Sequence, residues 1–213
     1  FNNESDCTKI LEISHWSNMS LGDSEGGYFF GCENLVITAK DDLNITGIRN
    51  MSNMFRDCTD LNLIEHISQW DVSKVTDMSF MFYRTPFNVD IGSWNISSVV
   101  DMSCMFYWAW EFNQDISSWD VSDVKNMSYM FYRAGYFNQD ISTWNVSQVT
   151  DMDNMFRQAY SFNQNINSWN TSRVTTMYRM FEEANDFNQN LTAWDVSKVT
   201  DMGRMFYWTD IFN

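Results

Sequence analysis

Two histidines, His15 and His66, are the only imidazoles in this 213-residue chain. His66 lies near Ser68 and Asp71 in sequence, but the three residues of a hydrolase triad are recognised by their geometry and not by sequence proximity. The chain also lacks a glycine-rich phosphate loop and the HExxH and GxSxG motifs of metalloproteases and serine hydrolases. We therefore interpret both histidines as surface residues and expect no catalytic residue and no enzyme.

Aspartates recur in two series and offer oxygen atoms to a metal ion. One series is Asp90, Asp115 and Asp140, and the other begins with Asp77 and Asp101. Carboxylates stacked ~5 Å apart repel by about 1 kcal/mol or more, and calcium, which prefers several oxygen ligands, would relieve that repulsion. However, asparagine or threonine interrupts both series, no dense DxDxD loop is present, and caps of turns or helices also explain the acids. We expect no cofactor and no metal site, with calcium as the alternative.

Acceptor signals for N-linked sugar, in which serine or threonine follows asparagine by two residues, occur nine times. Three of them, Asn95, Asn145 and Asn170, share one repeated position, so sugars there would line one face. The same residue type favours turns, and that interpretation stays open beside glycosylation, which requires a secretory route. The glycosylation candidates are Asn3, Asn18, Asn44, Asn50, Asn95, Asn126, Asn145, Asn170 and Asn190.

Aromatic side chains form two groups with different expected roles. Tryptophan recurs regularly and is expected in the core at positions 70, 94, 119, 144, 169 and 194. A second group differs from one repeat to the next, so the fold does not require it. Large aromatics of this kind are typical of protein or glycan contact surfaces, although a wider half-buried stripe would also account for them. These interaction candidates are Tyr83, Tyr107, Trp108, Trp110, Tyr132, Tyr136, Tyr160, Tyr207 and Trp208.

Cys7 and Cys32 both lie in the irregular first part of the chain. A disulfide between them would staple a segment that is poor in repeated core residues, and it would fit an oxidising compartment. Cys58 and Cys104 are about two repeats apart, roughly 10 Å, which is beyond the reach of a disulfide. We expect Cys58 to join the first segment or to be buried, and Cys104 to be a free thiol.

The charge and hydropathy of the chain exclude several classes of partner. The sequence has 13 Lys and Arg against 28 Asp and Glu, a net charge of −15. This balance disfavours nucleic acid and anionic lipid, because affinity for both comes largely from lysine and arginine. No apolar run reaches 18 residues, so we expect no insertion into a membrane. The first residues do not resemble a signal peptide, which we take to be absent or removed.

These residues recur because the chain is a tandem repeat. The dipeptide Met-Phe is spaced by 25 residues from its third occurrence onward, at 54–55, 81–82, 105–106, 130–131, 155–156, 180–181 and 205–206. Fourteen of the 15 methionines belong to two repeated positions, so they do not indicate a cofactor motif or a methionine-rich groove. A period of this length is typical of a solenoid, whose units must stack to bury their apolar faces.

Two local patterns within a unit predict a helix and a strand. Met127, Met130, Phe131 and Ala134 follow helical spacing, so we expect about two turns of helix over 77–85 and the equivalent segments. We interpret 113–119 and its equivalents as a short strand. Strands of successive units would form a parallel sheet, and crossovers of this type are right-handed. The expected fold is an α/β, right-handed leucine-rich-repeat-like solenoid with a short parallel strand and a short helix per 25-residue repeat.

The two ends depart from this pattern. Residues 1–40 are predicted to form an N-terminal cap, and 41–213 a solenoid of about seven repeats. The interval of 27 residues between the first two Met-Phe pairs, together with Pro86, leaves the first junction uncertain. The chain stops where another repeat would begin and shows no C-terminal cap, so we expect either a processed fragment or an end covered by another molecule.

The unit FNQDISSWDVSxVxDMxxMFxxA resembles the short leucine-rich repeats of the BspA-like, DUF285-type surface proteins of bacteria and mycoplasmas, over roughly residues 41–213. The resemblance implies a repeat fold, a secreted or surface-anchored location, and a role in adhesion and host contact. It supplies no catalytic residue.

We expect a secreted or cell-surface structural and interaction protein that acts by binding. The main hypothesis is head-to-tail self-assembly into an extracellular filament or surface layer, because a heterologous contact that does not close builds a filament. The alternative is an adhesin that binds glycans or a host receptor through exposed aromatics. The expected partner is therefore the chain itself, or a cell-surface protein or glycan.

Overall fold

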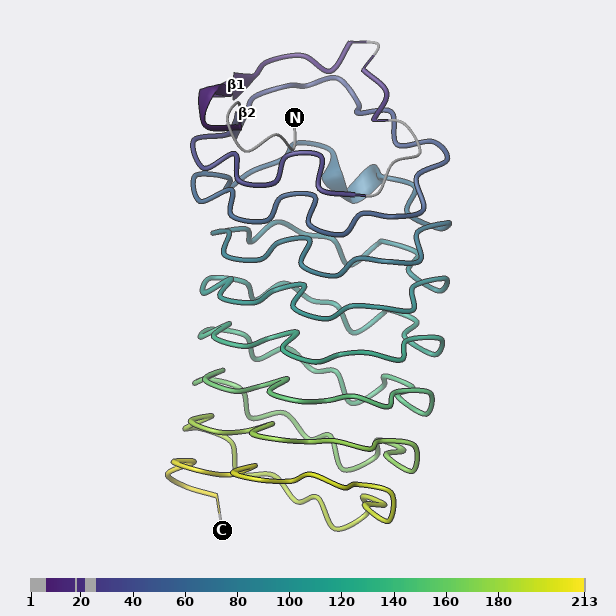
Figure 1. The fold of residues 1–213 in the computed structure, drawn as a ribbon, viewed down its shortest axis with the longest axis vertical. Helices are drawn as coiled ribbons and strands as arrows, with labels where there is room; N and C mark the ends of the chain where they lie inside the picture. The colour runs from purple at the N-terminus through teal and green to yellow at the C-terminus, as the bar shows by residue number, and fades with distance from the viewer. Residues whose placement is uncertain (1–6, 18, 22–25, 213) are drawn as a thin grey trace.

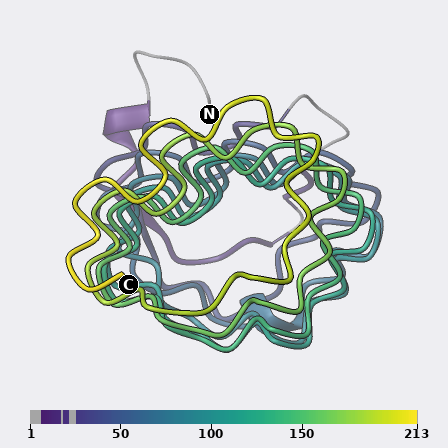
Figure 2. The same cartoon turned by 90° about the horizontal axis from the view of Figure 1, so that it is seen from below.

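The computed structural model describes residues 7–17, 19–21 and 26–212, and the chain winds as a stack of similar coils along one long axis (Figure 1). Seen along that axis, successive coils follow a common outline (Figure 2). Regular elements are few: the 3-10 helices η1 (Cys7–Lys9) and η2 (Ile67–Gln69), and the strands β1 (Glu12–Ile13) and β2 (Val36–Ile37), which pair in parallel. The remaining described residues are turns, single bridges and extended segments.

One residue per coil forms a parallel bridge with the next coil, at Asn50, Asp77, Asp101, Asn126, Asp151, Thr176 and Asp201. Beyond each bridge, backbone N–H groups donate alternately to the next coil and within their own coil. Met127 N–H donates to the Asp151 carbonyl at 3.0 Å and Tyr129 N–H to the Asp153 carbonyl at 2.8 Å, whereas Met130 N–H donates to the Met127 carbonyl at 3.2 Å. Every other amide is therefore used to stack the coils.

The helix expected over 77–85 is not formed, and this prediction is wrong. Residues 79–84 are consecutive turns, and two of them have left-handed backbone, with φ of 58° at Phe80 and 55° at Arg84. A residue with left-handed backbone at every fourth position is incompatible with an α-helix. An α-helix would also use its N–H groups in hydrogen bonds to its own carbonyls, so they could not bond to the next coil. The turns nevertheless bury Met78, Met81 and Phe82 completely, because they too point a side chain inward at every third or fourth position.

The strand expected over 113–119 is also absent from the described structure, and polar side chains make the connections between coils there. Asn138 N–H donates to Oδ1 of Asn113 at 2.9 Å, and Gln139 Nε2 donates to the Asn113 carbonyl at 3.0 Å. The same pair of bonds recurs in the neighbouring coils. An asparagine and glutamine ladder thus replaces the expected backbone ladder.

The core consists of aromatic columns that run along the stack. Phe131 is fully buried between Phe106 and Phe156, with ring centroids 5.7 and 5.6 Å away. The repeated tryptophans form a second column, as the sequence predicts: Trp144 stacks on Trp119 at 6.5 Å, and its Nε1 donates to a carbonyl of the preceding coil at 3.1 Å. Each ring therefore contacts the same residue type in the neighbouring units, which explains the aromatic content.

The stack extends into the segment predicted as a cap. Gly27 N–H donates to the Ser52 carbonyl at 2.6 Å, and Phe29 stacks on Phe55 at 5.6 Å with planes 5° apart. The columns thus cross the boundary expected at residues 40 and 41. The handedness and the leucine-rich-repeat likeness stay predictions. Of the helices that the structure describes, none is long and apolar enough to cross a bilayer.

The predicted Cys7–Cys32 disulfide is not formed in the structure. All four cysteines lie among the described residues, are buried and form no disulfide. Burial, followed by the charge of Cys7, raises the pKa of the Cys32 thiol to about 11, and burial raises that of Cys104 to about 12. The aromatic columns continue through these first coils, so packing holds this segment without a covalent staple.

Candidate binding site

The interaction candidates differ widely in exposure. Tyr136 and Trp208 are 56% and 64% exposed, and Trp108, Trp110 and Tyr207 are also exposed. Tyr83, Tyr107 and Tyr160 are half-buried. Tyr132 is buried, so its assignment to an exposed surface is wrong. It stacks against Tyr107 at 4.5 Å, and Tyr107 stacks against Tyr83 at 4.3 Å. Burial raises the pKa of Tyr107, and the three stacked tyrosines form a row that is buried at Tyr132 and half-buried at Tyr83 and Tyr107.

The most distinctive concavity lies where one coil is a residue short. In regular coils a two-residue turn, which we call the bulge, precedes the second phenylalanine, as at 110–111 and 135–136. Between Phe82 and Phe87 this bulge is replaced by Pro86 alone, and no turn is assigned there. The shorter connection at Pro86 coincides with a hollow on the surface of the stack.

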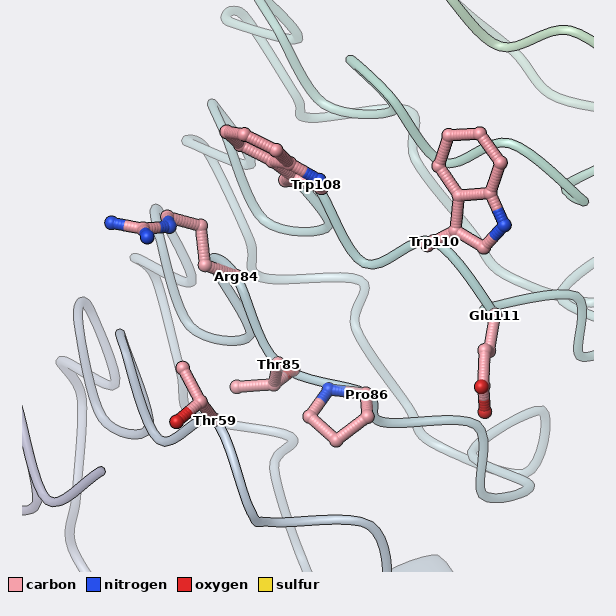
Figure 3. A pocket seen from close by; sticks show the side chains of 7 residues that line it. All are labelled: Thr59, Arg84, Thr85, Pro86, Trp108, Trp110 and Glu111. Atoms are coloured by element: carbon pink, nitrogen blue, oxygen red, sulfur yellow. The ribbon is translucent and has the colours of Figure 1, made fainter. Parts of the chain in front are cut away.

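The hollow has a volume of about 300 Å³ and is lined from three successive coils (Figure 3). Figure 3 shows Trp108 and Trp110 projecting from one coil, Arg84 and Pro86 from the second, and Thr59 from the third. The complete lining is Thr59, Arg84, Thr85, Pro86, Trp108, Trp110 and Glu111, which we call the Pro86 hollow. It combines two indole rings with one cation and one carboxylate.

The deletion also leaves backbone carbonyls open at the Pro86 hollow. In regular coils the second bulge residue donates its N–H to the preceding coil, as from Tyr136 to the Trp110 carbonyl at 3.2 Å. In the coil that contains Pro86, the residue whose N–H would donate to the Thr59 carbonyl is missing. The hydrogen bonds of the described residues include none from Glu111 N–H to the Pro86 carbonyl. Among the described residues, the carbonyls of Thr59 and Pro86 therefore lack the backbone donor that regular coils supply.

Trp110 is held in place by a neighbouring glycine. A Cβ atom on Gly135 would lie 2.9 Å from Cδ2 and Cε2 of the Trp110 indole, so the ring rests directly on the glycine backbone. Tyr136 and Tyr160 flank the ring, with centroids 5.9 and 5.6 Å away. Gly135 does not have positive φ, so its role is this close approach and not a special turn. The indole is therefore fixed in orientation while 39% of Trp110 stays exposed.

A protein-family model described as "Mycoplasma protein of unknown function, DUF285" matches residues 26–137 and 107–213, which together cover most of the chain. The chain belongs to this DUF285 family. The two matched regions overlap, as expected for a family that contains repeats. No curated protein matched the DUF285 chain.

The aspartate series of this DUF285 chain are explained by turns. In each, the side-chain oxygen accepts the N–H of the residue two positions later, as from Ser117 to Asp115 at 2.9 Å and from Ser142 to Asp140 at 2.9 Å. Asp77 and Asp101 accept in the same way at 2.8 Å. In the described part of the chain, no group of three or more His, Cys, Asp or Glu is placed to hold a metal ion.

Turns of the same kind at a third repeated position should make the stability of the DUF285 chain depend on pH. Hydrogen bonds from the serine hydroxyl and then the serine N–H two residues later lower the pKa of Asp71, Asp120 and Asp195 below the usual value of 3.8. Because the folded pKa is depressed, the stabilisation is present above about pH 4 and is lost as the pH falls through the lowered value.

Asparagine at the equivalent positions offers a matched replacement. Asn95, Asn145 and Asn170 accept the same serine N–H at 3.2 Å but do not titrate. Asp→Asn at 71, 120 and 195 together should therefore leave the urea midpoint at pH 7 nearly unchanged and reduce its decrease between pH 7 and pH 3. An equal decrease in the parent and the triple variant would show that these turns do not carry the acid sensitivity.

The remaining predicted residues are dispersed. The acceptor asparagines Asn44, Asn95, Asn145, Asn170 and Asn190 are exposed, Asn50 and Asn126 are half-buried, and Asn3 and Asn18 lie outside the described residues. His66 Nδ1 lies 3.1 Å from Asp42 Oδ1, but neither it nor His15 lines the Pro86 hollow. Sequence reasoning missed Thr59, Arg84, Pro86, Glu111 and Gly135 as site residues. The signal for them is the 24-residue spacing from Met81-Phe82 to Met105-Phe106.

Proposed function

We propose that this chain is a non-enzymatic interaction protein of the cell surface or extracellular space that binds glycan or protein partners through exposed aromatic side chains. The observation that carries the proposal is the contrast between two sets of rings. The repeated phenylalanine and tryptophan columns are buried, whereas Trp108 and Trp110 are 43% and 39% exposed beside a hollow. These two rings lie outside the buried columns and stay partly exposed, which favours a contact role. A BspA-like, right-handed leucine-rich-repeat-like solenoid is part of this proposal.

A glycan array tests this function directly. We expect the full chain to bind a defined set of glycans, and Trp110→Ala to reduce the signal on that set. Trp208→Ala is the matched control, because Trp208 is exposed but lies about four coils away from the hollow. Absence of any bound glycan on the array, or equal loss with both variants, would contradict glycan binding through this surface.

Head-to-tail self-assembly is a second candidate, supported by the edge of the last described coil. Met202 is 43% exposed and Val196 42%, whereas the equivalent Met177 and Val146 are buried in the interior of the stack. The side chains that a following coil would cover are exposed at this edge. That coil could belong to the same chain or to a second copy.

Sedimentation at increasing concentration tests self-assembly. We expect species larger than the 25.2 kDa chain, and their loss in the double variant Met202→Lys and Val196→Lys. Leu63→Lys is the control, because Leu63 is exposed and lies outside the last coil. A monodisperse particle of chain mass at high concentration would contradict the proposal.

We also propose that sugars line one face at Asn95, Asn145 and Asn170. These asparagines are exposed and occupy equivalent turns in the stack. Chain secreted from eukaryotic cells should lose mass on enzymatic deglycosylation, and Ser→Ala at 97, 147 and 172 should remove most of that difference. An unchanged intact mass after deglycosylation would show that these sites are not occupied.

A further inference from the structure

We propose that two copies of this chain pack side by side, running in the same direction, with the arginine–aromatic face of one copy against the aspartate column of the other. The arginine–aromatic face consists of the five-residue segments that begin one residue before each Met-Phe pair, such as 80–84 and 104–108. The aspartate column consists of the exposed residues Asp90, Asp115 and Asp140. This inference rests on the proposed self-assembly and adds a lateral contact to the end contact.

The composition of the arginine–aromatic face is that of a protein interface. The methionine and phenylalanine of each segment belong to the core columns, which leaves three further positions in each of the seven segments. Fourteen of these 21 positions hold Arg, Tyr, Trp or Phe, and none holds Lys. Protein interfaces are enriched in arginine and aromatic residues and depleted of lysine, so this face favours a protein as its partner.

The backbone conformation supports a contact role for the same side chains. The first and fifth residues of every segment have left-handed backbone, with φ of 55° at Arg84, 56° at Trp108 and 58° at Arg133. This conformation is strained for residues with a Cβ atom and favours Gly or Asn. Large side chains at these positions oppose the local backbone preference, which favours a role in contact with a partner.

Charge identifies the partner as acidic. The seven segments contain six arginines and three acids, a net charge of +3 in a chain of −15, so the rest of the chain carries −18. Asp57 is shared by two arginines, at 3.4 Å from Arg56 and 3.2 Å from Arg84. Within the described part of the chain, Arg133 forms no ion pair, and its Nε donates to Gln158. An acidic column of a second copy is therefore complementary to this face.

The exposed centre of the face is a row of three side chains from successive coils. The guanidinium carbons of Arg84 and Arg133 lie 5.6 and 4.5 Å from the centroid of the Trp108 ring. The Arg84 side chain is 49% exposed, and Trp108 is 43% exposed. The row thus presents a cation, an indole and a second cation at the spacing of the coils, which is ~4.8 Å for stacked backbone.

The aspartate column presents carboxylates at the same spacing. Oδ1 of Asp115 accepts the N–H of Ser117, and Oδ1 of Asp140 accepts the N–H of Ser142, each at 2.9 Å, so the turns hold these exposed side chains in place. Like charges stacked in this way repel one another, and cations opposite them relieve the repulsion. Because both columns repeat once per coil of the same fold, a match at one coil is repeated at the next.

The next two coils favour stacks that run in the same direction. With the row of three opposite the three aspartates in chain order, the face continues with Gln158 and Glu183, and the aspartate column continues with Asn165 and Asn190. The column therefore becomes neutral in the coils where the face no longer carries a cation in this row. No two like charges of these columns meet in this register.

Sedimentation equilibrium of the unglycosylated chain tests the lateral contact. Met202→Lys and Val196→Lys are present in every sample to block the end contact, and we expect this end-blocked parent to associate as its concentration rises. Physiological ionic strength screens charges more than about 8 Å apart, so the net repulsion between copies does not mask the contact. Thermal midpoints of all variants establish folding.

Charge reversal on either side should weaken the association. Arg84→Glu with Arg133→Glu should raise the dissociation constant at least about tenfold, which corresponds to about 1.4 kcal/mol. Asp90→Arg with Asp140→Arg should do the same, although it makes the chain less negative. An equal mixture of these two variants should associate as the parent does, because each face then meets a column of opposite charge.

Asp71→Arg with Asp120→Arg is the matched control. Both aspartates are exposed, cap the same kind of turn and lie two coils apart, so the net charge changes as in the other aspartate variant. This control should associate at least as tightly as the parent. Equal weakening by both aspartate variants would overturn the site.

Single exchanges within one chain test the register. Arg84→Glu combined with Asp90→Arg should restore association, whereas Arg84→Glu combined with Asp140→Arg should not. The reverse order would overturn the parallel register. These exchanges also decide the question if Arg133→Glu does not fold.

The outcomes separate this inference from the proposed self-assembly. An end-blocked parent that stays monomeric would overturn the lateral contact, while larger species of the unblocked chain would retain the end contact. Association that is insensitive to the charge reversals would overturn the assigned face. A monomeric chain that binds polyglutamate, and loses it with Arg84→Glu and Arg133→Glu, would replace the second copy by a foreign acidic protein. Binding of oligothymidylate with the same dependence would replace it by nucleic acid.

Discussion

Replacing Phe131 with alanine should lower the free energy of unfolding by about 3–5 kcal/mol, the range for truncating a buried phenylalanine. Phe131 is fully buried and contacts a ring on every side: Phe106 at 5.7 Å, Phe156 at 5.6 Å and Phe137 at 3.9 Å. The cavity would lie in the middle of the column, where both neighbouring coils are held by their own stacking partners and cannot collapse into it.

Phe206→Ala is the matched control for this experiment. Phe206 occupies the same column in the last coil, is half-buried, and stacks only on Phe181 at 5.6 Å and Phe212 at 4.0 Å. Urea unfolding followed by circular dichroism should show a smaller shift for Phe206→Ala than for Phe131→Ala. Equal shifts would mean that the column does not act as a continuous core. Because repeat stacks can unfold in parts, the two variants should also be compared for the breadth of the transition.

Replacing Glu182 with alanine should cost about 3 kcal/mol, because it leaves two partly buried arginines without their counter-charge. Glu182 is 3% exposed, its Oε1 lies 3.0 Å from Nη2 of Arg157, and its Oε2 lies 3.2 Å from Nε of Arg179. The second pair is at ion-pair distance without the alignment of a hydrogen bond. The arginine side chains are about one-fifth exposed, so we place the effect at the lower end of the range for a broken buried pair.

Asp186→Ala provides the comparison for Glu182→Ala. Asp186 is an exposed acid only four residues away, and a surface substitution of this kind changes stability by about 0.5 kcal/mol or less. Urea midpoints of the two variants, measured at low and high salt, should differ clearly under both conditions because a buried pair is weakly screened. Equal midpoints would show that solvent replaces the carboxylate without cost.

The sequence predicts the positions of the core residues, but it does not predict the local backbone conformation. The spacing of the Met-Phe and tryptophan positions predicts which side chains stack, and Phe131 and Trp144 lie in such columns. The helix over 77–85 was wrong because the i, i+3, i+4 pattern fits both an α-helix and a run of turns with left-handed residues such as Phe80 and Arg84. Only the position of the next coil, which takes every other N–H group, distinguishes the two conformations.

At the candidate site, too, the sequence predicts some features and only the packing of the coils shows the others. The unit-to-unit variation of Trp108 and Trp110 marks them in the sequence as residues that the fold does not require. Tyr132 belongs to the same variable group, yet it is buried because Tyr107 stacks on it from the neighbouring coil.

Residue type and spacing are enough to predict the repeat, the core columns and the family of this chain. Which variable aromatics are exposed, and where a hollow forms, depends on how neighbouring coils pack. The hollow lies beside the shorter connection at Pro86, and the ring of Trp110 packs on Gly135 of the following coil. The 24-residue spacing marks the short coil in the sequence, but both effects arise between coils that are about 25 residues apart, so the spacing alone does not show which side chains meet there.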